Sequence, residues 1–302
     1  DDDVAHVYWI VFHDGGDGTA ALVRRERVGQ HAPVAPHPRD GGGDAPRSGF
    51  GVPVAKSFGA GRYDEMRSHV FHGILLTVVF AVVLTAACAL LCPQILHLLS
   101  TPEDIFPDAY RYLLVIFLGI PFTLAYNLLA GILRAIGDSR TPFIFLAIST
   151  VLNIGLDFFC ILVLRWGCTG AAIATVMSQV ISSILCLIYI IKKVPLLHLT
   201  KEDCQVKGRG IQTMMVMGVP MGLQYSITAI GSMVMQSANN GLGSIYVSGF
   251  TAGMRIKQFL ICPFDAIATA VSVFCGQNLG AGKPKRIRQG IWQGMIVGVS
   301  YG

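Results

Sequence analysis

Charged side chains are scarce in this sequence of 302 residues. Asp, Glu, Lys and Arg together make up 14% of it, whereas 53% of the residues are hydrophobic and the mean hydropathy is +0.58. Soluble domains usually carry about 25% charged residues. The composition therefore excludes an ordinary soluble protein and indicates an integral membrane protein.

Several functional motifs are missing as well. The eight cysteines contain no CxxC pair and no histidine at zinc-ligand spacing, so we interpret them as small hydrophobic residues and expect no metal centre. The turn GAGK at 280–283 lacks the rest of a phosphate-binding P-loop, and the basic run RRER is too short to indicate nucleic-acid binding. We also find no pair of catalytic groups at matching membrane depth. We therefore expect neither an enzyme, nor a cofactor, nor a nucleic-acid partner.

Residues 1–48 differ from the rest of the chain. They mix glycine, proline and charge, with eight acidic and five basic side chains and no apolar run long enough to cross a bilayer. Their acidic start is unlike the basic n-region of a secretory signal. Such a composition cannot bury a core. We expect this segment to be disordered, and its abrupt join at Gly49 indicates an out-of-frame or foreign origin.

Long apolar segments follow one another from residue 70 onward. They cover 70–92, 110–133, 142–164, 168–191, 211–236, 244–277 and the residues from 289. A crossing needs about 20 apolar residues, so the sequence predicts an all-α, multi-pass membrane protein with six full spans and a partial seventh. The sixth segment is too long for one straight crossing and contains Pro263, so we expect it to be tilted, kinked or partly interfacial.

Loop charges and an internal repeat predict the topology. Of the 18 basic residues after position 48, 14 fall on one side of the membrane, which the positive-inside tendency makes the cytoplasmic side. AKSFGAGRYDEMR at 55–67 aligns without gaps on GQNLGAGKPKRIR at 276–288, and both copies lie on that side. Because both copies lie on the same side of the membrane, the repeat predicts two halves of parallel topology. We assign 49–207 to part of an amino-terminal lobe with its linker, and 208–302 to the start of a carboxy-terminal lobe.

Five motifs in order carry a family resemblance: LRAIGDSRTPF, STVLNIGLDFF, GCTGAAIATVMSQ, GVPMGLQYS and FCGQNLGAGKPKRI. Residues 49–302 resemble the multidrug and toxic compound extrusion (MATE) transporters. The resemblance implies a two-lobe bundle of twelve helices around a central cavity, of which this chain covers roughly helices three to eight and the start of nine. It also implies a monomer in the cell membrane that exports cationic or amphiphilic compounds in exchange for H+ or Na+.

The predicted cation site lies in the outer half of the first lobe. Asn153 and Asp157 are four residues apart and share one helix face. Asp157 and Thr175 both lie seven residues from the outer end of their spans, so they reach the same depth. The carboxylate of Asp157, the amide oxygen of Asn153 and the hydroxyl of Thr175 suit H+ or Na+. The resemblance assigns these three residues to cation coupling. The alternative role of Asn153 and Thr175 is interhelical hydrogen bonding alone. Gln179, one turn deeper, is a candidate for the cavity.

Two cations in the sixth apolar segment leave other functions open. Arg255 and Lys257 would line a cavity or pair with Asp265 if they are buried, and would otherwise reach toward water. A basic cavity would suit a lipid-linked glycan flippase of the same superfamily. The resemblance also places a helix-one carboxylate opposite Asp157, which this chain lacks, and a helix-seven glutamate where Thr228 stands. A transporter fragment without activity is therefore a further alternative.

Overall fold

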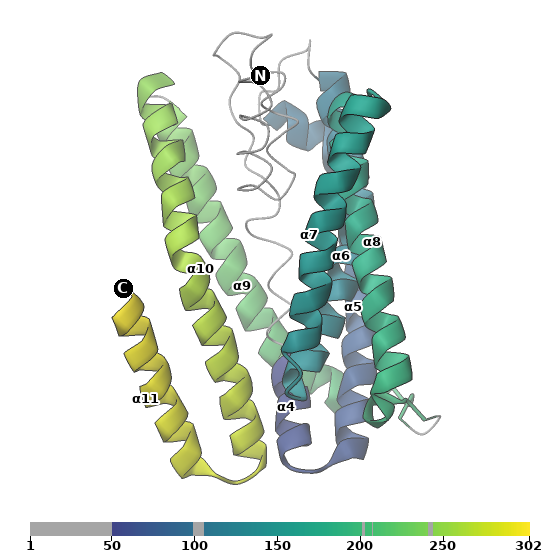
Figure 1. The fold of residues 1–302 in the computed structure, drawn as a ribbon, viewed down its shortest axis with the longest axis vertical. Coiled ribbons are helices and arrows are strands. Elements are labelled where there is room, and N and C mark those ends of the chain that lie inside the picture. The colour runs from purple at the N-terminus through teal and green to yellow at the C-terminus, as the bar shows by residue number, and fades with distance from the viewer. Residues whose placement is uncertain (1–49, 99–105, 201–202, 207, 241–243) are drawn as a thin grey trace. The chain divides into compact units, whose positions relative to one another are not determined.

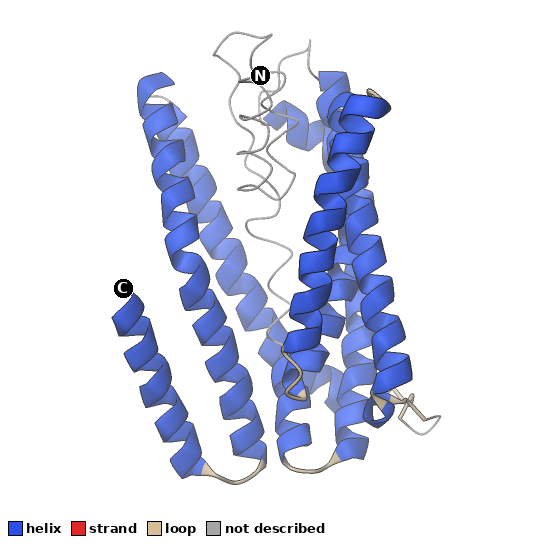
Figure 2. Ribbon diagram, viewed as in Figure 1, coloured by secondary structure: helices blue, strands red, loops and turns tan. Residues whose placement is uncertain are grey.

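The computed structural model describes residues 50–98, 106–200, 203–206, 208–240 and 244–302. Every regular element in these ranges is a helix (Figures 1 and 2). The elements are α4 (Gly51–Gly59), α5 (Tyr63–Leu98), α6 (Phe106–Ala135), α7 (Arg140–Phe158), η2 (Phe159–Val163), α8 (Gly167–Lys193), η3 (Pro195–Leu197), α9 (Gly208–Asn240), α10 (Ser244–Gly280) and α11 (Pro284–Tyr301). The predicted all-α fold is confirmed, whereas the predicted disorder of residues 1–48 lies outside the described residues.

Five helices of the described chain are long and apolar enough to cross a membrane. They are Tyr63–His97, Phe106–Ala135, Arg140–Val163, Gly167–Lys193 and Ala252–Gly280. The predicted span at 211–236 does form a helix, α9, but this helix is not among the five. Gln212, Gln224 and Ser226 interrupt its apolar residues, which lowers its overall hydropathy. The sixth predicted span is one continuous helix of 37 residues, α10.

The chain divides into two compact units. One contains Val78–Tyr126 and Arg140–Ile188, and the other contains the described part of Pro36–Thr77 with Asn127–Ser139 and Tyr189–Gly302. Helices α5, α6 and α8 contribute residues to both units. The boundary between lobes that we place at residues 207 and 208 stays a prediction.

The core of the first unit joins α5 to α6. Cys92, Leu96 and Phe117 are almost fully buried there, and partly buried residues such as Cys88 and Tyr110 pack around them. All eight cysteines are free thiols. At this place the cysteines pack as small hydrophobic side chains, which is the role that the sequence predicts for them.

In the second unit, the predicted repeat appears as two matching helical turns. One copy joins α4 to α5, the other joins α10 to α11, and each turns at a glycine with positive φ, Gly61 at 70° and Gly282 at 66°. Equivalent backbone bonds close both turns: Ala60 N to Lys56 O and Arg62 N to Ser57 O in one copy, Ala281 N to Gln277 O and Lys283 N to Asn278 O in the other. The repeat read from the sequence is therefore confirmed in the backbone.

The two copies also pack against each other, through α4 and α10. A Cβ built on Gly59 would lie 1.9 Å from the carbonyl oxygen of Gln277, and a Cβ built on Gly280 would lie 1.9 Å from that of Lys56. In the alignment Gly59 matches Gly280 and Lys56 matches Gln277. The contact is therefore the same in both directions, as expected for an interface with local two-fold symmetry.

Candidate functional site

Asp157 lies in the last turn of α7 and is almost completely buried, with 2% of its surface exposed. Neither of its carboxylate oxygens has a hydrogen-bond partner among the described residues. Buried polar groups nearly always find a partner, and a buried charge without one is costly. A proton or a bound cation would satisfy this carboxylate.

The chain changes its helical geometry immediately after Asp157. Residues Phe159–Val163 form the π-helical turn η2, in which the amide of Leu164 donates to the carbonyl of Phe159 at 3.1 Å. The next helix packs closely on this turn, because a Cβ on Gly170 would lie 3.0 Å from the Cβ of Cys160. Single π-helical turns often occur at functional sites. Neither apolar periodicity nor composition distinguishes this turn from ordinary helix, so the sequence does not predict it.

Asn153 meets Thr175 across the two helices, one turn from the equal-depth pair of Asp157 and Thr175 that the sequence predicts. The side-chain amide of Asn153 donates to Thr175 Oγ1 at 3.4 Å, and both side chains are buried. This bond uses the amide nitrogen, so the amide oxygen remains an acceptor. Asp157 follows Asn153 by one turn on the same face of α7.

The donors around Asp157 suit a hard cation. Carboxylate, amide and hydroxyl oxygens are the ligands that alkali and alkaline-earth ions prefer, and a proton needs only the carboxylate. In the part of the chain that the structure describes, no three His, Cys, Asp or Glu side chains gather in a way that could hold a metal ion. Among the predicted site residues, Asn153 and Thr175 carry buried side-chain oxygens on α7 and α8.

The other predicted site residues are less enclosed. Gln179 is half-buried on α8, one turn beyond Thr175. Lys257 is exposed on α10, and so is Asp265, its predicted partner. The side chain of Arg255 lies outside the described part of the structure. Thr228 is exposed on α9, where its hydroxyl donates to the carbonyl of Gln224 at 2.9 Å.

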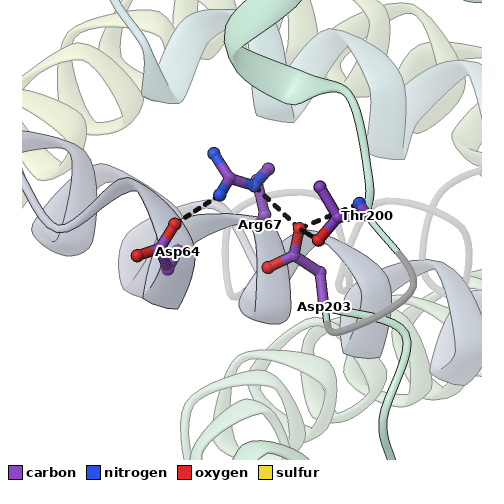
Figure 3. A network of polar contacts seen from close by, with 4 residues as sticks. All are labelled: Asp64, Arg67, Thr200 and Asp203. Carbon is purple, nitrogen blue, oxygen red and sulfur yellow. Dashed lines mark hydrogen bonds and ion pairs between the residues drawn. The ribbon is translucent and has the colours of Figure 1, made fainter.

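A second polar network, which the sequence does not predict, ties the linker after α8 to the start of α5. Arg67 lies between Asp64 and Asp203 in Figure 3, and its Nε donates to Asp203 Oδ2 at 2.8 Å. The backbone amide and the hydroxyl of Thr200 donate to the same oxygen, at 2.9 Å and 2.7 Å. Burial alone raises the pKa of Asp203, but these bonds and the Arg67 charge hold that pKa below its usual value. The network connects residues 136 positions apart, a separation that no local pattern signals.

The protein-family model MatE matches residues 47–159 and 220–302 of the chain. The chain belongs to the MatE family. The matched ranges include α4 to α7 with Asn153 and Asp157, and most of α9 with α10 and α11. Family membership, which the resemblance in the sequence implied, is thus confirmed.

Individual relatives agree with this membership. The MatE chain is 36% identical to the probable multidrug resistance protein YpnP of Bacillus subtilis over 228 residues, 74% of this chain and 49% of that protein. It is 27% identical to the probable multidrug resistance protein YoeA of the same organism, over 83% of this chain and 57% of that protein. The MatE chain therefore spans about half the length of these curated relatives.

A solved structure shows the same fold. A multidrug resistance MATE family transporter of the MOP superfamily, in an outward-facing conformation, matches with a TM-score of 0.82 at 21% identity, over 98% of this chain and 66% of that one. The predicted MATE-like helical fold is confirmed by this likeness.

Proposed function

We propose that this MatE protein belongs to a cation-coupled antiporter that exports cationic or amphiphilic compounds by alternating access, with H+ or Na+ as the coupling ion. The observation that carries the proposal is the buried carboxylate of Asp157, which has no described partner and lies one turn from the Asn153–Thr175 pair. Family membership and the names of YpnP and YoeA support export of drugs as the activity.

In this proposal Asp157 binds the coupling cation and Asn153 and Thr175 complete its ligand shell. Cation binding removes the cost of an unpaired buried carboxylate, so it favours whichever arrangement of the lobes encloses the site. Release on one side of the membrane and rebinding on the other would alternate between these arrangements, because a ligand shifts an equilibrium only through different affinities for its states. We propose that the protein does so as a monomer in the cell membrane, without a further cofactor.

The decisive test removes the charge of Asp157 and keeps its size. Asp157→Asn in the full-length protein should abolish ethidium efflux from lipid vesicles while membrane insertion stays normal. Asp265→Asn is the matched control, since Asp265 is an exposed carboxylate in another membrane-length helix and should leave efflux unchanged. Efflux by Asp157→Asn at the normal rate would exclude the proposed role.

The coupling ion is identified by applying the gradients one at a time. We expect efflux to respond to an inward H+ gradient without Na+, to an inward Na+ gradient at equal pH, or to both. A protein that inserts normally but responds to neither gradient would exclude the antiporter and favour the inactive fragment.

A lipid-linked glycan flippase is the second candidate. The observation that favours it is the pair of cations Arg255 and Lys257, within three residues of each other in a membrane-length helix. An anionic pyrophosphate headgroup would need such charges. Lys257→Gln should then abolish the flipping of a lipid-linked oligosaccharide in vesicles, whereas the antiporter predicts no such flipping in either protein.

A further inference from the structure

Two buried side-chain contacts join α7 to α8, and they lie one turn apart. The hydroxyl of Ser149 donates to the backbone carbonyl of Ser178 at 3.2 Å, and the amide of Asn153 donates to Thr175 Oγ1 at 3.4 Å. All four side chains are buried, and Ser149 has 4% of its surface exposed. Ser149, Asn153 and Asp157 are spaced by four residues, so they form one stripe along α7.

The segment of α8 that receives these contacts is held by its own hydroxyl groups. Ser178 donates to the carbonyl of Thr175 at 2.8 Å, and Ser182 donates to the carbonyl of Ser178 at 2.9 Å. The carbonyl of Ser178 thus accepts both the hydroxyl of Ser149 from α7 and that of Ser182 from α8. The bond from Ser149 therefore ends on the same short stretch of backbone that carries Thr175.

We propose that Ser149 is a positioning residue for the cation site, because its bond to Ser178 fixes the register of α7 along α8. The inference rests on the function proposed above. Apolar faces alone set register weakly in a membrane, where interhelical hydrogen bonds and small side chains determine how helices align. A slip of one turn, about 5.4 Å, would separate Asn153 from Thr175 and change the distance between Asp157 and Thr175. Ser149 itself touches no cation.

The test measures how cation dependence changes when this hydroxyl is removed. Ethidium efflux by the full-length protein in lipid vesicles is titrated with external Na+ at fixed pH, and with external pH in the absence of Na+. Ser149→Ala should raise the concentration of the active cation needed for half-maximal efflux by about threefold or more, since it removes one interhelical bond. The KM for ethidium should stay unchanged, because Ser149 is buried against α8. Ser149→Thr keeps the hydroxyl and should restore the normal cation dependence.

Thr150→Ala is the matched control. Thr150 is the next residue of α7, is exposed, and donates its hydroxyl to the carbonyl of Leu146 at 3.0 Å within its own helix. Its removal should change neither titration. A purely structural role for Ser149 would lower the amount of folded protein without moving the cation midpoint, so folded protein is quantified by size-exclusion chromatography for every variant.

The outcomes separate this inference from the proposed function. Normal cation dependence in Ser149→Ala, together with loss of efflux in Asp157→Asn, would overturn the positioning role and leave the antiporter intact. Normal efflux in Asp157→Asn would overturn both. If Ser149→Ala does not fold, Ser149→Cys is used, because it retains a weak donor. It should raise the cation concentration for half-maximal efflux by a smaller factor, and an unchanged midpoint would also overturn the positioning role.

Discussion

Gly59 and Gly280 occupy equivalent positions of the repeat, and each lies against the backbone of the helix that carries the other. A side chain at Gly59 would meet the carbonyl of Gln277, and one at Gly280 would meet the carbonyl of Lys56, both at 1.9 Å. Backbone atoms cannot move aside as the end of a flexible side chain can. The close approach of α4 and α10 therefore requires a residue without a Cβ at both positions.

Gly280→Ala should destabilise the protein by about 1–3 kcal/mol, because the added methyl group forces the two backbones apart. Gly59→Ala should have a similar effect, since its contact is equivalent. The free energy of unfolding in mixed micelles measures both. Gly253→Ala, in the same helix as Gly280 but with open space around it, should be neutral or stabilising. Equal stabilities of Gly280→Ala and Gly253→Ala would contradict the close contact.

The local features of this fold are predictable from the sequence, because they depend on neighbouring residues. Apolar length predicts the helices, and the match of 55–67 with 276–288 predicts the two glycine turns. The sequence places Thr175 on the helix that faces Asn153 and Asp157, at the depth of Asp157, whereas the contact that forms joins Thr175 to Asn153, one turn away. These three inferences need only helix geometry and chain order.

Contacts between distant segments are not predictable from the local sequence. Asp203 lies in a polar linker, where its sequence neighbours give no reason to expect burial against Arg67 of α5. The π-helical turn after Asp157 lies against α8 at Cys160, a contact that apolar patterning does not encode. Both features involve tertiary packing, which local sequence preference alone does not specify.

The Asp203 network should make stability depend on pH in the acid range. The folded protein holds the pKa of Asp203 below its usual value, so this carboxylate stabilises the fold above its unfolded pKa of about 3.9. That contribution is lost as the pH falls through the lower, folded pKa. Asp203→Asn should therefore be less stable than the parent at pH 7, and the difference should shrink toward pH 3. Thermal unfolding of both proteins from pH 7 to pH 3 measures this difference in stability. A difference that stays constant with pH would exclude the ionisation of Asp203 as its cause.

Arg67→Ala should cost more than Asp64→Ala. Arg67 is the charged partner of the buried Asp203, whereas Asp64 is 93% exposed. Removing Arg67 leaves Asp203, among the described residues, with the two donors of Thr200. Removing Asp64 breaks a solvent-exposed pair, which contributes about 0–1 kcal/mol. The midpoint temperatures of the two variants in detergent are compared at pH 7. An equal loss in both would show that burial of Asp203 does not matter.

Thr175→Val should weaken the cation site while keeping its shape. The substitution removes the hydroxyl that accepts from Asn153, so one interhelical bond of about 0.6 kcal/mol is lost and a cation loses an oxygen ligand. We expect a higher cation requirement for ethidium efflux and only a small change in stability. Thr228→Val is the control, because that hydroxyl is exposed and bonds within α9. Identical titrations for the two variants would remove Thr175 from the site.

Gln277→Leu should loosen the junction between α10 and the end of α6. The side-chain amide of Gln277 donates to the carbonyl of Ala135 at 2.8 Å, at a helix end where carbonyls have no partner within their own helix. Loss of this bond should cost about 1 kcal/mol in the free energy of unfolding. Gln258→Leu makes the same chemical change at an exposed position of α10 and should cost less. Gln277 also supplies the carbonyl that Gly59 meets. The stability losses of Gln277→Leu and Gly59→Ala should therefore deviate from additivity when the two are combined, whereas those of Gln258→Leu and Gly59→Ala should be additive.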